Sequence, residues 1–237
     1  MISVVVPLYN EGDRVNHLLT HLRQIPGLAE VVLVDASDEP ASIAAMVKLA
    51  DRLDEQTEVD PLVRLVKYPV SGRAAQMNTG AKICSSAILL FLHCDTRLPF
   101  TAAEKILQCI NTGSVWGRFN VQLDASSMAF RVIETMINLR SRFRHIATGD
   151  QAMFVQKEVF VQQHGFADIA LMEDVEISQR LKQIAPPALI GEPVLTSARR
   201  WQRDGILRTV LLMWKLRLLY WLGRDPDCLA TMYRNAR

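Results

Sequence analysis

Three apolar runs in this chain, residues 2–7, 30–35 and 87–92, each lead directly into polar side chains. Apolar runs that are bounded by polar residues are typical of strands buried in a covered sheet. Open α/β sheets bind their ligands at the carboxyl ends of such strands. The sequence therefore predicts a covered sheet with one chemically active edge.

Between these runs lie segments in which apolar residues recur at helical spacing. Helices are expected over residues 11–25, 41–53 and 71–84, and another begins at Thr101, while residues 63–67 form a further strand. Strands that alternate with helices predict βαβ units and a mainly parallel central sheet flanked by helices. Two local signals mark helix starts: Ser71 as a cap, and a capping box of Thr101 with Glu104.

The pattern changes after Thr112. In residues 115–123 the apolar positions alternate with four others, which predicts a half-exposed strand; these are Trp116, Arg118, Asn120 and Gln122. Helices are expected over residues 127–143 and 173–184, with a turn and a short strand over residues 149–155. This less regular part is expected to complete a cleft over the sheet.

Composition excludes several classes of protein. Of 237 residues, 49% are hydrophobic and 22% are charged, as in folded soluble domains, and the net charge of +2 is too small to indicate a nucleic-acid partner. Four widely spaced cysteines form no zinc-type pair, which predicts reduced thiols in a cytoplasmic protein. Met1 leads into a strand-like run with no basic segment before it, so no signal peptide is expected. No apolar stretch reaches about 18 residues, so no membrane span is expected.

The C-terminal stretch is expected to be a separate feature. Residues 1–204 are predicted to form the main domain, and residues 205–237 a helical extension. Residues 205–223 are mostly apolar but include basic residues and aromatic rings. An amphipathic helix of this kind can pack on the domain, form a homodimer contact, or lie on the inner face of a membrane.

The polar residues after the first two runs suit a nucleoside. Tyr9 can stack on a base, and Glu11 can accept a hydrogen bond from a ribose or base donor. Asp35 can accept an N–H group from a uracil-like or guanine-like base. Asn10 is more simply a cap of the next helix, and Asp38 is an equal candidate to cap the helix after that.

The residues after the run 87–92 suit a metal and a phosphate. Asp95 is the strongest candidate, because one carboxylate beside a diphosphate is a common way to hold Mg²⁺ or Mn²⁺. His93 is a second candidate ligand, although a histidine at a strand end is more often a hydrogen-bonded core residue. Arg73 begins a helix rich in small residues and can pair with phosphate. Those small residues permit close approach to a ligand or to a neighbouring strand.

Two later clusters add a base and further cations. Three carboxylates fall within four positions: Glu173, Asp174 and Glu176. One of them pointing into a cleft can act as a general base, and the alternative is an acidic first turn favoured by the helix dipole. The run Arg199-Arg200-Trp201 suits a departing pyrophosphate or, equally, a surface ion-pair cluster.

Taken together and in this order, these segments resemble a family 2 glycosyltransferase of the GT-A fold. The matching stretches are VVVPLYNE, VLVDASD, GRAAQMNTGA, LFLHCDT, GDQAMF, HGF, MEDVE and ARRW. The combination of HCD, GDQ, MED and SARRW is similar to a compact bacterial subgroup named for its association with radical-SAM and selenodomain proteins.

The resemblance implies a role for each candidate residue at a nucleotide-diphospho-sugar site. The nucleoside is held by Pro7, Tyr9, Glu11 and Asp35. Arg73 meets the diphosphate. Asp95 binds the divalent metal as the last position of a DxD-type motif, whose first position here is His93. Asp174, with Glu173 beside it, deprotonates the acceptor hydroxyl. The acceptor or diphosphate side holds Gly149, Asp150, Gln151, Arg199, Arg200 and Trp201.

The function expected from this resemblance is that of a metal-dependent inverting glycosyltransferase. A UDP-sugar is the favoured donor and a GDP-sugar the alternative, and the acceptor is a sugar, a lipid-linked sugar or a small molecule. Two other readings stay open. One is a catalytically silent sugar-nucleotide-binding or scaffold protein. The other is a nucleotidyltransferase, which usually has a basic glycine-rich loop where this chain has PLYNEGDR.

Overall fold

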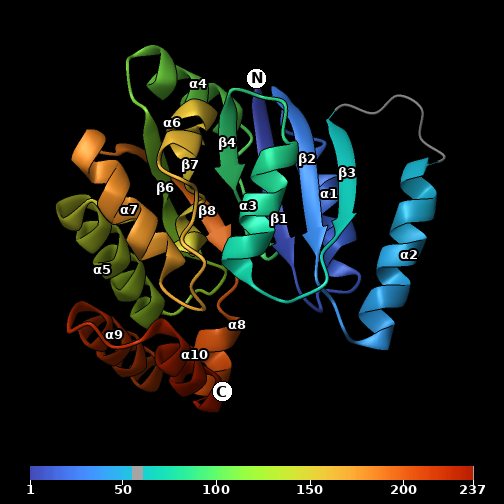
Figure 1. The fold of residues 1–237 in the computed structure, drawn as a ribbon. Coiled ribbons are helices and arrows are strands. Elements are labelled where there is room, and N and C mark those ends of the chain that lie inside the picture. Colours follow the sequence, from blue (N-terminus) through green and yellow to red (C-terminus); the bar gives the residue numbers. More distant parts are fainter. Residues whose placement is uncertain (55–60, 237) are drawn as a thin grey trace.

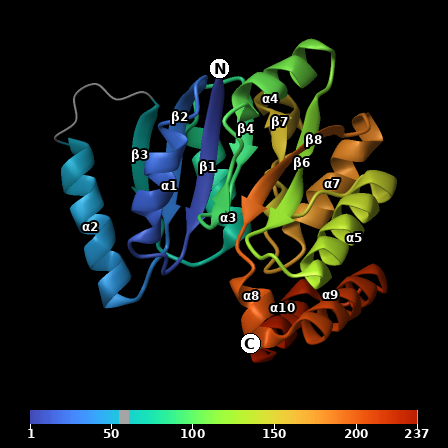
Figure 2. The ribbon, with the colours of Figure 1, turned by 180° about the vertical axis from the view of Figure 1, so that it is seen from behind.

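The computed structural model describes residues 1–54 and 61–236 of the chain. Within these residues a single mixed sheet of eight strands forms the centre of the molecule, and helices cover both of its faces (Figures 1 and 2). In spatial order the strands are β3 (Leu62–Lys67), β2 (Leu28–Asp35), β1 (Ile2–Leu8), β4 (Ile88–Phe91), β7 (Phe154–Gln156), β6 (Trp116–Leu123), β8 (Ala188–Thr196) and β5 (Thr96–Arg97). The predicted α/β class is confirmed.

Strand direction divides the sheet into two parts. Strands β3, β2, β1 and β4 are parallel to one another, as the alternation of strands and helices predicts. Strand β7 then runs antiparallel to both β4 and β6, β6 is parallel to β8, and β5 is antiparallel to β8. The second part is connected irregularly, so the βαβ pattern holds only for the first.

The helices fall on the two faces of the sheet and at one end of it. They are α1 (Arg14–Leu22), α2 (Pro40–Asp54), α3 (Arg73–Ile83), α4 (Ala102–Asn111), α5 (Met128–Arg144), α6 (Lys157–Gln162), α7 (Glu173–Ile184), α8 (Arg199–Asp204), α9 (Ile206–Trp221) and α10 (Pro226–Asn235). A short 3₁₀ turn, η1 (Gly149–Gln151), precedes β7. Helices α8, α9 and α10 gather at the lower end in Figures 1 and 2.

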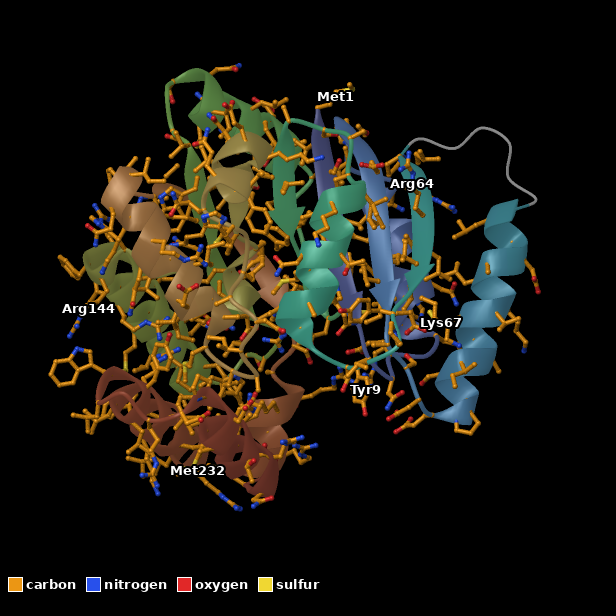
Figure 3. The ribbon with its side chains drawn as sticks, viewed as in Figure 1. Met1, Tyr9, Arg64, Lys67, Arg144 and Met232 are labelled. Atoms are coloured by element: carbon orange, nitrogen blue, oxygen red, sulfur yellow. The ribbon has the colours of Figure 1, made fainter. Side chains whose placement is uncertain are left out.

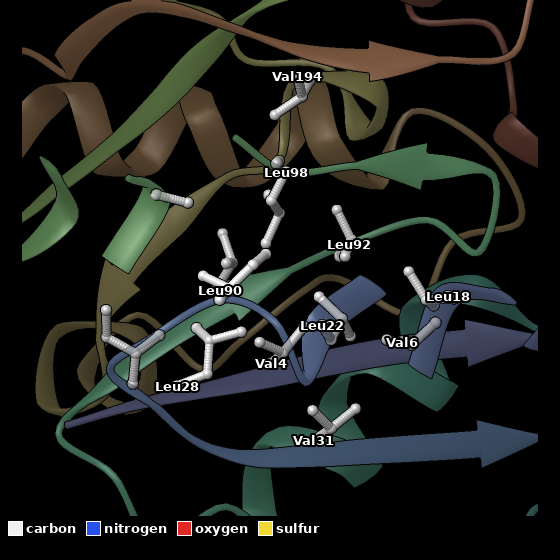
Figure 4. Packing of buried hydrophobic residues seen from close by; sticks show 14 of the residues in the cluster. Val4, Val6, Leu18, Leu22, Leu28, Val31, Leu90, Leu92, Leu98 and Val194 are labelled. Carbon is white, nitrogen blue, oxygen red and sulfur yellow. The ribbon is translucent and has the colours of Figure 1, made fainter. Parts of the chain in front are cut away.

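Two apolar clusters hold the layers together, one on each face of the sheet. Because successive strand residues point to opposite faces, β1 contributes to both. Val4 and Val6 pack with Leu18 and Leu22 of α1 (Figure 4). On the other face, residues of β1 and β2 pack against α3, α6 and α7. The apolar strand runs are therefore buried on both sides, as their composition predicts.

The predicted strand over residues 115–123 forms as β6, but the prediction that it is half exposed is wrong for its first half. Trp116 and Arg118 of β6 are fully buried. The Trp116 indole N–H donates to the Ala185 carbonyl at 2.8 Å, and the Arg118 guanidinium donates to the Asn138 carbonyl of α5 at 3.1 Å. Period-two alternation therefore misleads here, because distant backbone carbonyls satisfy polar atoms that would otherwise need water.

Three predicted helix caps also differ from the structure. Asn10 does not cap α1; its side-chain oxygen accepts the N–H groups of Asp38 and Glu39, at 3.1 Å each. Thr101 precedes α4 without capping it, and its hydroxyl donates to Glu192 instead. The N-cap of α3 is Gly72, one residue after Ser71, and no side chain caps it. Long-range partners have replaced the local ones in the first two cases.

The C-terminal helices contact the start of α7. Leu216 of α9 and Leu229 of α10 form a small apolar cluster with Met172. Across residues 1–54 and 61–236, we find no helix with the length and apolarity needed to cross a membrane.

Helix α3 lies unusually close to the sheet, and Gly80 permits this. A Cβ atom on Gly80 would lie 2.5 Å from Cγ1 of Val5 and 3.2 Å from Cγ2 of Val34. The small residues of α3 thus allow close approach to neighbouring strands, one of the two alternatives open from the sequence.

We expect Gly80→Ala to lower the free energy of unfolding by about 1–2 kcal/mol. Overpacking costs about 1–3 kcal/mol, which exceeds the gain of up to about 1 kcal/mol in helix propensity. The measurement is urea denaturation. Gly191→Ala is the matched control, because no atom lies within 4 Å of a Cβ built there. Equal stability of the two variants would contradict this account of α3 packing.

Candidate functional site

A cavity of about 530 Å³ lies where β4 and β8 end and where α3 and α7 begin. Helices α5, α8 and α9 close its other side. Nine of the residues predicted from the sequence line it: Arg73, His93, Asp95, Gly149, Asp150, Glu173, Asp174, Arg200 and Trp201. Six others lie outside this lining: Pro7, Tyr9, Glu11, Asp35, Gln151 and Arg199.

The proposed nucleoside residues lie at the edge where β1 and β2 end. Figure 3 places Tyr9 at this edge, and its hydroxyl donates to the Asp38 carboxylate at 2.9 Å. Asp35 is almost fully buried, and its Oδ1 accepts the Ser37 N–H at 3.2 Å and the Ser37 hydroxyl at 2.5 Å. The structure thus brings Tyr9 and Asp35 to one rim.

Two polar residues that sequence reasoning gave no such role hold this rim in place. The Asn10 backbone N–H donates to the Ser37 hydroxyl at 3.0 Å, which joins the loops after β1 and β2. The buried Gln76 side chain of α3 donates to the carbonyls of Leu8 and Val34, at 2.7 and 2.8 Å. In the sequence, Gln76 is recognisable only as a polar residue among the small residues of its helix.

Asp95 follows β4 and faces the cavity. Partial desolvation raises its pKa, and the negative charge of Glu11 raises it further, while Arg199 and Arg73 oppose both effects. Glu11 itself is paired with Arg14 at 3.0 Å. A carboxylate in this setting is stabilised by a nearby cation.

The protein offers an incomplete set of metal ligands. Within the part of the chain that the structure describes, no three His, Cys, Asp or Glu side chains converge on one point. A hard divalent cation needs six or more oxygen ligands, and Mg²⁺ sites often combine one or two carboxylates with substrate phosphates and water. The residues present therefore fit a metal that Asp95 and a diphosphate hold jointly.

His93 packs tightly against the turn η1. A Cβ atom on Gly149 would lie 2.5 Å from Nε2 of His93, so only glycine fits there. Burial, and next the positive charge of Arg73, lower the pKa of His93 to about 3. The imidazole is therefore neutral at physiological pH.

The adjacent carboxylates Glu173 and Asp174 have different environments. Glu173 is buried and pairs with Nη1 of Arg73 at 3.4 Å. Asp174 faces the cavity, and its two oxygens accept the N–H groups of Gly149 and Val175, at 2.8 and 2.7 Å. The third carboxylate of this turn, Glu176, is paired with Arg180.

Asp174 has the proton affinity that a general base needs. Burial raises its pKa most, and the negative charge of Glu173 adds to this, so that the pKa reaches about 7. The Gly149 and Val175 N–H groups and Arg73 act in the opposite direction. A carboxyl group with this pKa exchanges protons near neutral pH.

The other predicted residues divide between the cavity and its support. Gln151 is fully buried, and its side-chain oxygen accepts the Thr148 N–H at 3.1 Å, so it shapes η1. The Arg200 guanidinium lies over the Tyr233 ring, 4.1 Å from the ring centre. Arg199 does not line the cavity, although its charge acts on Asp95.

Sequence reasoning missed Arg140 of α5, which lines the cavity. Burial lowers its pKa, while the charges of Asp150 and Asp174 raise it. Its Nε and Nη2 atoms are buried and have no hydrogen-bond partner among the described residues. The sequence held no clear signal for it, because Arg142 and Arg144 are spaced alike on the same helix and are exposed.

Solved structures with a similar fold come from a bacterium and an archaeon. Residues 1–349 of S. aureus TarS are 14% identical, with a TM-score of 0.66 over 88% of this chain and 64% of that chain. The same fragment in complex with UDP-GlcNAc gives 14% identity and a TM-score of 0.64 over 83% and 58%. The Pyrobaculum calidifontis mannosyltransferase PcManGT, in complex with GDP-Man and Mn²⁺, gives 18% identity and a TM-score of 0.62 over 87% and 61%. This chain thus spans less than two thirds of each.

No curated protein sequence matches the chain. The model of the glycosyl transferase family 2 matches residues 3–163, which is more than half of it. This match covers the sheet edge, Arg73, Asp95 and η1. The similar structures share the fold of which these elements are part. The chain therefore belongs to glycosyl transferase family 2.

Proposed function

We propose that this protein is a metal-dependent, inverting glycosyltransferase that uses a nucleotide-diphospho-sugar. The observation that carries the proposal is the pairing of Asp95 and Asp174 in one cavity. The first is an open carboxylate suited to a shared cation. The second is a buried carboxyl group that titrates near neutral pH. Glycosyl transfer needs both, one for the leaving group and one for the attacking hydroxyl.

The donor lies along the rim formed by β1, β2 and α3. Pro7, Tyr9, Glu11 and Asp35 hold the nucleoside, and the diphosphate extends toward Arg73 and Asp95. The charge of Arg73 acts on His93, Asp95 and Asp174 alike, which supports a central position for the diphosphate. The side from which the diphosphate leaves is formed by Arg199, Arg200 and Trp201.

Asp95 would hold Mg²⁺ or Mn²⁺ together with the diphosphate, with His93 as the candidate further ligand. When bound, such a cation neutralises charge that develops on the departing diphosphate. The chain's own contribution is to hold Asp95 open at the end of β4 and to orient the phosphates through Arg73. Among similar structures, PcManGT contains GDP-Man and Mn²⁺, which supports a divalent metal here.

Asp174 removes the proton from the acceptor hydroxyl. The Gly149 and Val175 N–H groups hold its carboxylate in one orientation. The activated oxygen attacks the anomeric carbon directly from the side opposite the diphosphate, so the configuration of that carbon inverts. Glu173 raises the basicity of Asp174 and anchors Arg73. Gly149 and Asp150 form the wall beside the reacting atoms, and the buried Gln151 shapes the turn behind them.

A UDP-sugar is the favoured donor and a GDP-sugar the alternative. Asp35 at the rim suits the N–H of uracil, and TarS is described with UDP-GlcNAc. PcManGT is described with GDP-Man, which supports the alternative. The acceptor belongs to the sugars, the lipid-linked sugars or the small molecules.

We also propose a subgroup for the chain, a division into domain and extension, a contact for that extension, and a cellular location. We place the chain in the compact subgroup associated with radical-SAM and selenodomain proteins, on its HCD, GDQ, MED and SARRW motifs. Residues 205–237 form an extension beyond the main domain, residues 1–204. This extension packs on the domain, meets a second copy of the chain, or meets the inner face of a membrane. The protein resides in the cytoplasm.

The donor and the metal can be identified by thermal stability of the purified protein. We expect UDP or GDP to raise the Tm only in the presence of Mg²⁺ or Mn²⁺, and Asp95→Asn to abolish the shift. A ligand at a hundred times its Kd stabilises a protein by about 2.7 kcal/mol. Asp51→Asn, an exposed change on α2, is the control and should keep the full shift. Equal shifts with metal and with EDTA would contradict a shared metal site.

Replacing the base should separate turnover from binding. We expect Asp174→Asn to lower kcat for release of the nucleotide from its sugar by about 10²–10⁴-fold, the usual contribution of a general base, with little change in the nucleotide Tm shift. Glu176→Gln, in the same helical turn but outside the cavity, should keep most of the activity. Unchanged turnover in Asp174→Asn would favour a catalytically silent binding protein.

The raised pKa of Asp174 also predicts opposite pH trends for activity and stability. The base works only when ionised, so kcat/KM should rise as the pH passes through about 7. The native state holds this proton more tightly than the unfolded chain, whose aspartates titrate near 3.8. The free energy of unfolding should therefore fall as the pH rises from 3.8 to about 7. Thermal melting of the wild type and of Asp174→Asn at pH 5 and pH 8 checks this. The stability of the variant relative to the wild type should be higher at pH 8 than at pH 5. A pH-independent difference would contradict it.

A further inference from the structure

The cavity continues past Asp174 into a space between α5 and α9. Several apolar side chains line this part: Ile133, Met136 and Ile137 from α5, and Val210, Met213 and Trp214 from α9. A sugar nucleotide presents mainly polar and charged groups, so it has little use for such a lining. Strands β1 and β2, which end in the proposed donor rim, lie away from α5 and α9 (Figure 1), which leaves this part of the cavity for the acceptor.

Arg140 of α5 is a charged residue in this part of the lining. Its Nε and Nη2 atoms are buried without a hydrogen-bond partner among the described residues, which is costly because their N–H groups lose their solvent partners. Asp150 and Asp174 act on Arg140 through their charge, but no hydrogen bond joins either of them to it. An anionic group in the cavity would pair with the positive charge of Arg140, which lines the cavity. Arg217 of α9 also lines the cavity and adds positive charge.

The apolar lining continues onto an exposed face of the same two helices. On α5 the exposed apolar residues follow one another three or four positions apart, which places them in one stripe; they are Met128, Val132, Met136, Leu139 and Phe143. A second stripe on α9 consists of Leu207, Leu211, Trp214, Leu218 and Trp221. Figures 1 and 2 show α9 running beside α5.

Met136 and Trp214 belong both to the cavity lining and to these exposed stripes. The buried and exposed apolar surfaces are therefore continuous. Contiguous exposed apolar surface marks an interaction site more often than scattered single residues do. A chain of methylene groups that starts in the cavity would run out along this surface and bury apolar area at both helices.

We propose that the acceptor is an anionic amphiphile whose carboxylate or phosphate group pairs with Arg140 and whose apolar chain lies along α5 and α9. This inference rests on the proposed glycosyl transfer. The acceptor's hydroxyl oxygen forms the bond to the anomeric carbon, and its proton passes to Asp174. The bond from that carbon to the diphosphate oxygen breaks, and the nucleotide leaves with the electron pair.

The test uses small probes with the wild type in the presence of UDP and Mn²⁺. Octyl phosphate and octanoate provide the two anionic groups, octyl β-glucoside is the neutral amphiphile, and inorganic phosphate is the anion without a chain. Binding is followed by tryptophan fluorescence, because Trp201 and Trp214 line the cavity. At least one of the two anionic probes should bind about tenfold or more tightly than both octyl β-glucoside and inorganic phosphate. The stronger of them identifies the group.

Variants of two arginines on one helix separate a specific site from general charge. Arg140→Gln should remove the tenfold preference, and Arg140→Lys should keep part of it. Arg142→Gln is the matched control, because Arg142 is exposed and lies outside the cavity, so it should behave as the wild type. Equal behaviour of Arg140→Gln and wild type, or loss of the preference in both Gln variants, would overturn the proposal.

The hydrocarbon part has its own variant. Met136→Ser should weaken octyl phosphate binding several-fold and leave the binding of inorganic phosphate unchanged. Val47→Ser, at an exposed apolar position on α2, should change neither. If inorganic phosphate binds as tightly as octyl phosphate, the proposal that the acceptor has an apolar chain is overturned.

The nucleotide distinguishes this inference from the function on which it rests. Octyl phosphate that displaces UDP would place Arg140 in the donor site and overturn the acceptor assignment. If the wild type binds neither UDP nor GDP with metal but binds octyl phosphate through Arg140, the proposed transferase fails while the anion site stands. If the nucleotide binds and no amphiphile is preferred, only the acceptor inference fails.

Discussion

The close packing of α3 on β1 and β2 is the constraint on which the site depends. Gly80 removes the atom that would hold the helix away from Val5, and the buried Gln76 amide joins the ends of both strands to the helix. Once α3 is held there, its first residue, Arg73, has a fixed place at the sheet edge. From that place its charge acts on His93, Asp95 and Asp174.

Burial assigns different tasks to neighbouring carboxylates. Glu173 and Asp174 are adjacent on α7, yet one is paired with Arg73 and the other accepts two backbone N–H groups at the cavity. Their proximity makes Asp174 harder to ionise, which suits a base that must accept a proton at neutral pH. Asp95 is more open and has Glu11 nearby, which suits a cation instead.

The two parts of the sheet position the two sides of the reaction. The parallel part ends in the residues proposed for the donor. The irregular part carries η1, α5 and the C-terminal helices, which enclose the space beyond Asp174. The match to the family spans residues 3–163, which includes α5 but not the C-terminal helix α9.

The sequence by itself determined the order of strands and helices from β1 to β4, the polar edge of the sheet, and nine of the residues that line the cavity, including Asp95 and Asp174. These follow from hydrophobic periodicity and from polar residues at strand ends, which are local properties of the chain. Only the tertiary structure decided that Trp116 and Arg118 are buried and that Asn10 binds the loop after β2 instead of capping α1. It also decided that, of the four arginines on α5, Arg140 lines the cavity. The reason is that burial and hydrogen bonding between distant segments depend on which elements pack together, and local sequence patterns do not specify that packing.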